Sequence, residues 1–458
     1  MNKVISDWYE KNGDSVKSWA KDIWDNCEIA MEEYHACEVT AEFMKKHGFD
    51  VKTLNCKFPG ERFNTVVASW GSGHPVIGYI GEYDGLTGMG QECVPYYSPK
   101  EGPGHGCGHN LMSPSCGSAA IACKEAMEAE GLPGTVMFFA CPAEETVEGK
   151  IYMASLGLFD SLDVCMAWHP QPRNLKIREL RQCSLTNMKV EFFGLAAHAS
   201  VYPERGRSAL DACEIMNVGV NYLREHVEST TRMHYSYING GDKPNIVPSY
   251  AALHYFLRTK DLKSNYELLE RVKKCAEGAA IMTETKYKIT VNSMGPGCIQ
   301  LNGFNRFLYE AASKIPKITY SAEDEAYARE LFTNINGREP KDGENVIFTE
   351  IEEPTGNPVY APSSTDAGVV SRICPTSRLY GWGELNLTPS HSWGYVSCSG
   401  SEIGLKSAVY AGMAQAQAGY EIARNPSVIK PWREDLDRQL ADDGNLVPIK
   451  PNTVYSES

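Results

Sequence analysis

The chain has 458 residues, and its 58 acidic residues outnumber its 44 lysines and arginines, which gives a formal net charge of -14 at pH 7. This length exceeds what one hydrophobic core supports and suits two domains. The acidic balance argues against nucleic acid and against an anionic membrane surface as binding partners.

The sequence shows no transmembrane stretch and no N-terminal secretory signal. Its 15 cysteines are scattered without the spacing of a disulfide framework. We therefore expect reduced thiols and a cytoplasmic protein.

The N-terminal part is helical in pattern from residue 5 to residue 47, with Gly48 as a stop signal. Its polar residues Glu28, Glu32, Glu33 and His35 are expected on a solvated face. Three short β-like runs follow, at 51–54, 63–70 and 76–80. The last run leads directly into Asp84, and ligands bind at the carboxyl ends of parallel strands.

A glycine-rich loop at 104–110 contains Cys107 and His109, and a helix is expected at 114–129. The continuous apolar run 135–141 has the pattern of a strand buried on both faces, and it ends in Glu144 and Glu145. A second such strand, 163–168, ends in His169. These strand ends are expected to converge.

The pattern changes between residues 182 and 296, where strands and helices follow in the order βαββαβ. The expected elements are a strand at 185–193, a helix at 208–226, strands at 233–238 and 250–257, a helix at 262–282 and a strand at 287–293. This order is ferredoxin-like and indicates an inserted domain. The larger α/β domain, built on a mixed sheet, would comprise 1–181 and 297–458, with a disordered tail after Val447.

Five side chains are candidate metal ligands: Cys107, His109, Glu145, His169 and His391. Charged groups at the ends of apolar strands are costly unless they are paired or coordinated. Five ligands of mixed S, N and O type exceed the needs of one tetrahedral zinc ion and suit two metal ions. With Glu144 as a base for an activated water, this set predicts hydrolysis of an amide or ester carbonyl.

Six motifs together resemble the aminoacylase/carboxypeptidase-type di-metal amidohydrolases: GEYDGL, GHGCGHN, CPAEE, AWHP, FFGLAAHAS and PSHSW. The resemblance covers nearly the whole chain and is strongest for the branch of p-aminobenzoyl-glutamate, hippurate and indoleacetyl-amino-acid hydrolases. It implies that the five candidates above bind two zinc or manganese ions. It also implies that Glu144 is the general base, which passes its proton to the leaving amine, and that Asp84 orients a metal ligand.

The same resemblance implies that the inserted domain is a lid and the dimerisation domain of a homodimer. His198 would donate to the developing oxyanion, in relatives from the partner subunit. Asn245 and Arg258 would hold the free carboxylate of an N-acyl or N-aroyl amino acid, and a related second subunit is possible. Two departures bear on the substrate: residues 146–149 are less glycine-rich than in close relatives, and Val369 replaces an expected acid.

Three alternatives remain open. Cys107 could be a nucleophile with His109 as its base, although this leaves the other candidate ligands without a role. The chain could instead be a metal-binding scaffold, or a subunit that needs a partner for activity. The substrate could also be a small peptide, as for a dipeptidase or carboxypeptidase.

Overall fold

The structure is a computed structural model that describes residues 1–60 and 62–456, and the chain divides into two compact units. The first unit contains Met1–Leu180, Ile299–Val359 and Val370–Gln439; the second contains Arg181–Cys298, Tyr360–Val369 and Leu440–Ser458. The expected insertion at 182–296 falls in the second unit, which also takes in two later segments. Within the described residues, none of the helices combines the length and apolar character needed to cross a membrane.

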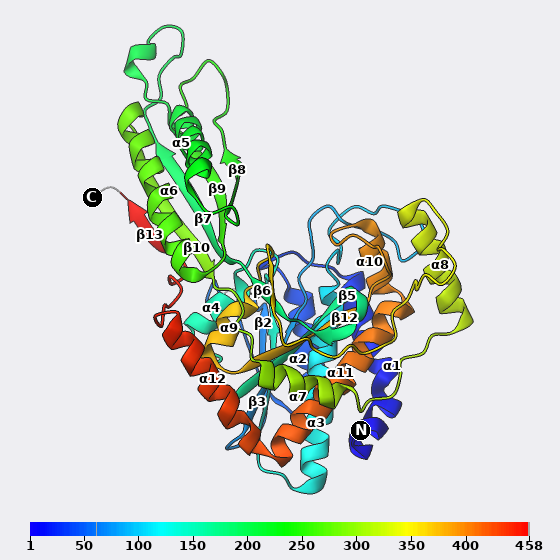
Figure 1. Cartoon of the computed structure of the whole chain (residues 1–458). Helices are drawn as coiled ribbons and strands as arrows, with labels where there is room; N and C mark the ends of the chain where they lie inside the picture. Colours follow the sequence, from blue (N-terminus) through cyan, green and yellow to red (C-terminus); the bar gives the residue numbers. More distant parts are fainter. Residues whose placement is uncertain (61, 457–458) are drawn as a thin grey trace. The chain divides into compact units, whose positions relative to one another are not determined.

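The first unit is built on a six-stranded sheet in the order β1-β2-β4-β3-β5-β12 (Figure 1). The strands are β1 (Asp50–Leu54), β2 (Thr65–Ser72), β3 (Val76–Glu82), β4 (Gly134–Cys141), β5 (Val164–Ile177) and β12 (Thr376–Gly383). Strands β4, β3, β5 and β12 run parallel, whereas β1 and β2 pair antiparallel. The mixed sheet confirms the predicted α/β fold class.

Helices α3 (Met112–Glu130) and α11 (Glu402–Arg424) are buried along most of their length, because they pack on each other and on the sheet. The other helices with residues in this unit are α1 (Lys3–Asp25), α2 (Tyr34–Lys46), α4 (Gly149–Ser155), α7 (Asn302–Ala312), α8 (Ala322–Asn336), α9 (Ala367–Ile373), α10 (Trp393–Gly400) and α12 (Ile429–Asp442). Two short strands, β6 (Leu180–Gln182) and β11 (Val359–Ala361), form a separate pair.

The N-terminal helical pattern is interrupted, and α1 and α2 are separate helices. The break has a local cause, since the Glu28 carboxylate accepts hydrogen bonds from the backbone N–H groups of His35 and Ala36. It thereby satisfies donors in the first turn of α2, which have no partner within the helix. Glu33 is fully buried, so its expected place on a solvated face is wrong.

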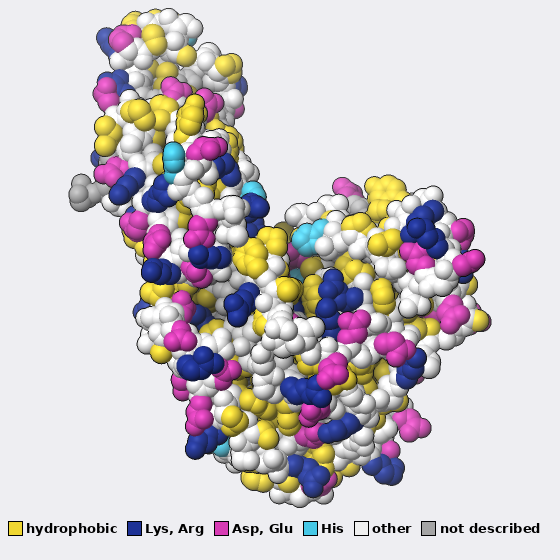
Figure 2. Space-filling view, in the orientation of Figure 1, with side chains coloured by type: hydrophobic (Ala, Val, Ile, Leu, Met, Phe, Trp, Pro, Cys, Tyr) yellow, Lys and Arg dark blue, Asp and Glu magenta, His cyan; other side chains and the backbone are white. Residues whose placement is uncertain are grey.

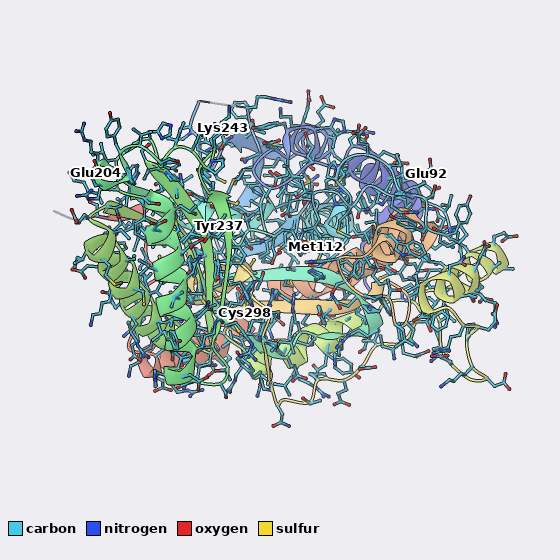
Figure 3. The ribbon with its side chains drawn as sticks, turned by 90° about the horizontal axis from the view of Figure 1, so that it is seen from above. Glu92, Met112, Glu204, Tyr237, Lys243 and Cys298 are labelled. Carbon is cyan, nitrogen blue, oxygen red and sulfur yellow. The ribbon has the colours of Figure 1, made fainter. Side chains whose placement is uncertain are left out.

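The second unit contains a five-stranded antiparallel sheet in the order β13-β10-β7-β9-β8. Its strands are β7 (Ser184–Phe193), β8 (Arg232–Asn239), β9 (Tyr250–Thr259), β10 (Lys286–Gly295) and β13 (Thr453–Ser456), and helices α5 (Ala209–Leu223) and α6 (Leu262–Thr283) pack on it. The predicted βαββαβ order is confirmed. Strand β8 forms one edge and carries Tyr237, which Figure 3 labels.

The described part of the C-terminal tail, up to Ser456, is ordered where disorder was expected. Residues Thr453–Ser456 form β13, which pairs with β10. The Tyr266 hydroxyl donates to the carbonyl of Val447 at 2.5 Å, and the Lys273 ammonium lies 3.9 Å from the Tyr455 ring centroid. The expectation was wrong because it rested only on the composition of the tail. The edge of β10 has unpaired backbone N–H and C=O groups, and the tail forms hydrogen bonds with them.

Basic and acidic side chains are interspersed over the face drawn in Figure 2. Many form exposed ion pairs, such as Lys3 with Asp7 and Arg433 with Asp437. Exposed pairs of this kind contribute at most about 1 kcal/mol each. The stability of the units therefore rests mainly on their buried cores.

Candidate metal centre

The glycine-rich loop turns sharply between its two candidate ligands. Gly108 has φ = +71°, and a Cβ atom there would lie 2.8 Å from Cγ of Pro170. Only glycine fits this backbone without strain. The turn leads into a short 3₁₀ helix at His109–Leu111 and then into α3, whose first residue, Met112, is labelled in Figure 3.

Three neighbouring parallel strands bring the other candidates to one edge of the sheet. Asp84 follows β3, and Glu144 and Glu145 follow β4. His169 belongs to β5, which was expected to end at residue 168. The strand continues to Ile177 because β12 pairs with it on both sides of a register shift.

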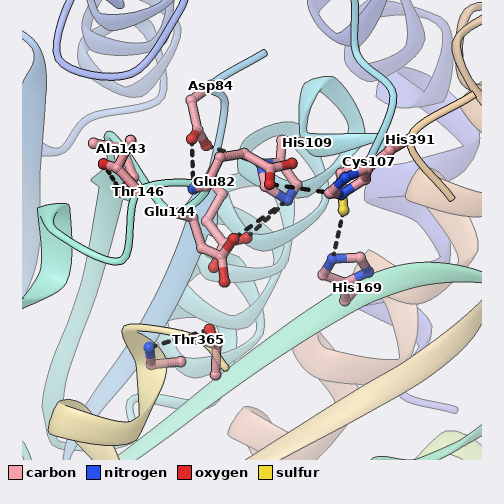
Figure 4. Close-up of polar contacts among 12 residues, drawn as sticks. Glu82, Asp84, Cys107, His109, Ala143, Glu144, Thr146, His169, Thr365 and His391 are labelled. Carbon is pink, nitrogen blue, oxygen red and sulfur yellow. Dashed lines mark hydrogen bonds and ion pairs between the residues drawn. The ribbon is translucent and has the colours of Figure 1, made fainter. Parts of the chain in front are cut away.

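His109 is fixed in one orientation at the centre of the cluster (Figure 4). Its Nδ1 donates to Oδ1 of Asp84 at 2.8 Å, and Oδ2 of Asp84 accepts the backbone N–H of Glu145 at 2.9 Å. Both side chains of the His109–Asp84 pair are fully buried. The lone pair of Nε2 is therefore directed at the cluster, where a metal ion would bind.

Burial opposes the charged form of His109, but the neighbouring Cys107 and Asp84 raise its pKa well above the ordinary value. A ligating histidine must be neutral, so a bound metal ion would take the place of the proton that these neighbours favour.

The remaining candidates form two further contacts. Sγ of Cys107 lies 3.5 Å from Nε2 of His169, whose Nδ1 donates to the carbonyl of Pro170 at 2.7 Å. Nε2 of His391 lies 3.6 Å from Oε2 of Glu145. The backbone N–H of His391 donates to Gly106, and its φ of +56° is unusual for a residue with a side chain.

These residues fit a metal site. Ligand atoms fall into three groups whose members lie within 4.8 Å of one another, and Cys107 is common to two of them: Cys107–His109–His169, Cys107–Glu145–His391 and Glu82–His109–Glu144. Two ligands of one tetrahedral zinc ion, at most one of them a thiolate, lie roughly 3.3–3.6 Å apart, given bonds of about 2.0–2.2 Å to N and O and about 2.3 Å to S. The Cys107–His169 and His391–Glu145 separations match this range.

Unpartnered buried atoms support the same conclusion. Nε2 of His109, Oε2 of Glu82 and Oε1 of Glu145 are buried and make no hydrogen bond. Leaving such groups unpaired is costly, and three of them in one cluster suit the binding of a cation. Burial and the Glu145 carboxylate raise the pKa of Cys107 to about 12, which disfavours Cys107 as a metal-free nucleophile.

The loop that carries Glu144 and Glu145 is strained, and a hydrogen bond to the buried Glu33 stabilises it. Ala143 and Val147 both have φ = +55°, a left-handed conformation that disfavours β-branched valine. Oε1 of the buried Glu33 accepts the backbone N–H of Ala143 at 2.6 Å. Burial, and then the charge of Asp84, raise the pKa of Glu33 well above its ordinary value. The deviation from a glycine-rich loop is thus accommodated as backbone strain beside the expected base.

Sequence reasoning missed two residues of this cluster, Glu82 and Lys150. Nζ of Lys150 lies 2.7 Å from Oε1 of Glu82, and both side chains are almost entirely buried. One signal was available for Glu82, which lies two residues before Asp84 and so points to the same face of an extended strand. Nothing local in the sequence signals a buried lysine at position 150.

His105, the other histidine of the loop, contacts helix α1 instead of the cluster. Its Nε2 lies 3.1 Å from the carbonyl of Ile23 in α1, and its side chain is buried. Burial lowers the pKa of His105 to about 4, so the ring is neutral. It fixes the loop to α1 rather than contributing a ligand.

The other three candidates lie in the second unit. Nδ1 of the exposed His198 accepts backbone N–H groups of Ser200 and Val201, at 3.2 and 3.3 Å, which leaves the hydrogen on Nε2. Asn245 lies beside it in the same unit, since its carbonyl accepts the N–H of Ala199. Nε of Arg258 makes no hydrogen bond, and Nη1 lies 3.1 Å from Nδ1 of His234.

Comparison with known proteins identifies relatives over the whole chain. Residues 180–282 match the M20 peptidase dimerisation domain. The chain is 32% identical to one of the subunits of p-aminobenzoyl-glutamate hydrolase of Escherichia coli, over 99% of this chain and 98% of the relative. It is 28% identical to human Xaa-Arg dipeptidase, over 92% and 88% of the two chains.

A solved structure has the same fold. An aminobenzoyl-glutamate utilization protein from Klebsiella pneumoniae aligns with a TM-score of 0.64 at 18% identity. The alignment covers 90% of this chain and 98% of that protein.

Proposed function

The chain belongs to the M20 family of peptidases and amidohydrolases, in the branch of p-aminobenzoyl-glutamate hydrolase, and we propose that this hydrolase cleaves the amide bond of an N-acyl or N-aroyl amino acid. The observation that carries the proposal is the convergence of one thiol, three imidazoles and one carboxylate beside Glu144. Those five ligands are Cys107, His109, Glu145, His169 and His391.

Two divalent ions held by these residues would supply Lewis acidity and lower the pKa of a bound water towards about 7. Glu144, whose Oε2 lies 4.0 Å from Nε2 of His109, takes the proton of the attacking water and passes it to the leaving amine. Asp84 keeps the hydrogen of His109 on Nδ1. The carbonyl of Pro170 does the same for His169. Each imidazole therefore presents an unprotonated Nε2 to the cluster.

His198 is the proposed donor to the oxyanion that forms during attack. The hydrogen-bond pattern supports this role, because Nδ1 is already an acceptor and Nε2–H is left to donate. One preorganised donor of this kind is worth roughly 10²–10³ in turnover.

Asn245 and Arg258 are the proposed carboxylate-binding residues. Arg258 is not in an ion pair with any described acidic side chain, and its cross-strand neighbour on β8 is a second cation, Arg232. Like charges directly opposite each other are unfavourable in a sheet, and an anionic substrate group would relieve this repulsion. The arrangement favours a substrate with a free carboxylate, a group that p-aminobenzoyl-glutamate shares with dipeptides that end in arginine.

Ligand chemistry, the matched domain and the cysteines bear on the metal, the assembly and the compartment. A thiolate ligand favours zinc, whereas the carboxylates also accept manganese. The matched dimerisation domain supports a homodimer formed through residues 182–296, which we also propose to act as a lid. A related second subunit is consistent with the name of the Escherichia coli relative, which describes it as one subunit of its hydrolase. All 15 cysteines are free thiols, which supports a reducing, cytoplasmic location.

The test combines metal content with turnover. The protein is assayed as purified, after stripping with a chelator, and after reloading with zinc or manganese. Substrates are p-aminobenzoyl-glutamate, a panel of N-acyl and N-aroyl amino acids, and dipeptides that end in arginine. Glu144→Gln should abolish turnover without loss of metal, and Glu10→Gln on the exposed surface of α1 serves as the control.

Loss of turnover on stripping, with recovery on reloading by one metal, would support the proposal, and the panel would identify the substrate. Turnover of arginine dipeptides alone would favour the dipeptidase alternative. Bound metal without turnover of any substrate would favour a subunit that needs a partner. Activity that survives complete metal removal would refute the mechanism.

A further inference from the structure

A second carboxylate faces the metal-binding nitrogen of His109. Oε2 of Glu82 lies 3.4 Å from Nε2 of His109, and both atoms are buried without a hydrogen bond (Figure 4). This separation equals that expected for two ligands of one tetrahedral ion, roughly 3.3–3.6 Å. Glu82 also belongs to a ligand group with His109 and Glu144.

The other oxygen of Glu82 is anchored by Lys150. The Nζ–Oε1 distance is 2.7 Å, the lysine side chain is 0% exposed and the glutamate side chain is 5% exposed. Burying an ammonium group is strongly unfavourable unless an anion accompanies it. The lysine therefore keeps Glu82 as a carboxylate and fixes its direction, so that only Oε2 is free to bind elsewhere.

The position of Lys150 is not explained by helix stability. It lies in the first turn of α4, a seven-residue helix that begins at Gly149. A cation at a helix N-terminus is unfavourable, because it opposes the helix dipole. The first turn is also held against the preceding loop, since a Cβ at Gly149 would lie 1.7 Å from the carbonyl oxygen of Pro142. Local structure thus brings the lysine to Glu82 despite its cost.

We propose that Glu82 is an additional oxygen ligand on the His109 side of the metal centre, held in place by the buried Lys150. The proposal rests on the metal site put forward above. It distinguishes this centre from one built on the five ligands alone, and it makes Lys150 a positioning residue that acts through Glu82.

The experiment compares Glu82→Gln with the double variant Glu82→Gln/Lys150→Met. The first change removes the carboxylate charge at constant shape but takes from the buried Lys150 ammonium the anion that lies 2.7 Å away. The second removes both charges, so folding no longer depends on the pair. Asp324→Asn is the matched control, because Asp324 forms a largely buried ion pair with Lys406 at 2.6 Å in the same unit and has no contact with the metal cluster among the described residues.

Zinc and manganese affinities are measured on the full-length protein by competition with chelators of graded strength. The thermal midpoint is recorded for stripped and loaded protein. We expect both Glu82 variants to bind one of two metal equivalents more weakly by at least roughly 10–100-fold, the loss typical of residues that only support a metal ligand. Without metal, the double variant should have the same thermal midpoint as the unaltered chain without metal. Its metal affinity should nevertheless stay low.

A merely structural ion pair gives a different pattern. In that case Glu82→Gln lowers the thermal midpoint, the double variant restores it, and both bind metal as tightly as the unaltered chain, which would overturn the inference. If the unaltered chain itself binds no metal, both the proposed function and the role of Glu82 are refuted. If the unaltered chain binds metal and the Glu82 variants bind it equally well, only the role of Glu82 is refuted.

Discussion

Replacing Asp84 with asparagine tests how far the metal centre depends on residues that do not bind the metal. Asp84 accepts two hydrogen bonds, one from Nδ1 of His109 and one from the backbone N–H of Glu145. Asparagine offers a single oxygen for these two donors. Its NH₂ group must face the other donor, in a place that solvent does not reach.

The magnitude follows from the two contacts. One buried donor left without an acceptor costs about 1–3 kcal/mol of folding free energy. At about 2–4 °C per kcal/mol for a large domain, the thermal midpoint should fall by roughly 2–12 °C. If the asparagine NH₂ faces His109 instead, the ring hydrogen moves to Nε2 and blocks metal binding. Metal affinity should then fall roughly 10–100-fold.

The assay is metal content after dialysis, together with the thermal midpoint of the stripped protein. Asp22→Asn is a suitable control, because Asp22 also pairs with a histidine, His35, but on the surface, where the side chains are 42% and 37% exposed. That change should alter stability by no more than about 0.5 kcal/mol and leave metal content unchanged. If Asp84→Asn retains both its metal and its midpoint, the second-layer role of Asp84 is refuted.

Four further outcomes are expected. His198→Asn should lower kcat roughly 10²–10³-fold with metal content and stability unchanged, and an unchanged kcat would exclude the oxyanion role. Arg258→Gln should raise KM for an anionic substrate far more than for its amide analogue; equal effects on both would contradict carboxylate binding. Gly108→Ala should cost at least about 1–2 kcal/mol from left-handed strain and reduce metal loading, because its Cβ would overlap Pro170; normal loading would contradict the need for glycine. Ending the chain at Leu446 should destabilise the second unit by ~2 kcal/mol, given about 1 kcal/mol per backbone hydrogen bond, and calorimetry would show no shift if β13 contributes nothing.

The convergence of several candidate ligands could be predicted from the sequence because their positions follow a simple rule. Apolar runs that end in charged residues indicated buried parallel strands, and β4, β3 and β5 are neighbours in the sheet. Asp84, Glu144 and Glu145 meet there for that reason. His391 lies in a loop, so no sheet rule predicts its place beside the other candidates.

The missed residues depend on contacts between distant segments. Glu33 was taken for a surface residue because its neighbours are polar, yet it is buried beneath Ala143, 110 residues away in the chain. Lys150 is similar, since only its ion pair with Glu82, at the end of β3, explains a fully buried ammonium. Strand β13 needs a free sheet edge that the tail itself cannot reveal. Local pattern fixes which elements form, whereas such long-range pairings require the folded chain.

Metal removal should affect the two units unequally, because all the candidate ligand groups among the described residues lie in the first unit. A ligand that binds only the folded state stabilises it by RT ln(1 + [L]/Kd), which is about 4 kcal/mol when the free ion is present at 1,000 times its dissociation constant. Stripping should therefore lower the calorimetric transition of the first unit and leave that of the second in place. The buried carboxylates Glu82, Asp84 and Glu145 make this difference larger, since each loses a cationic neighbour when the ions leave. If the chelator shifts both transitions equally, or shifts neither, then no metal ion that stabilises the first unit is bound at this cluster.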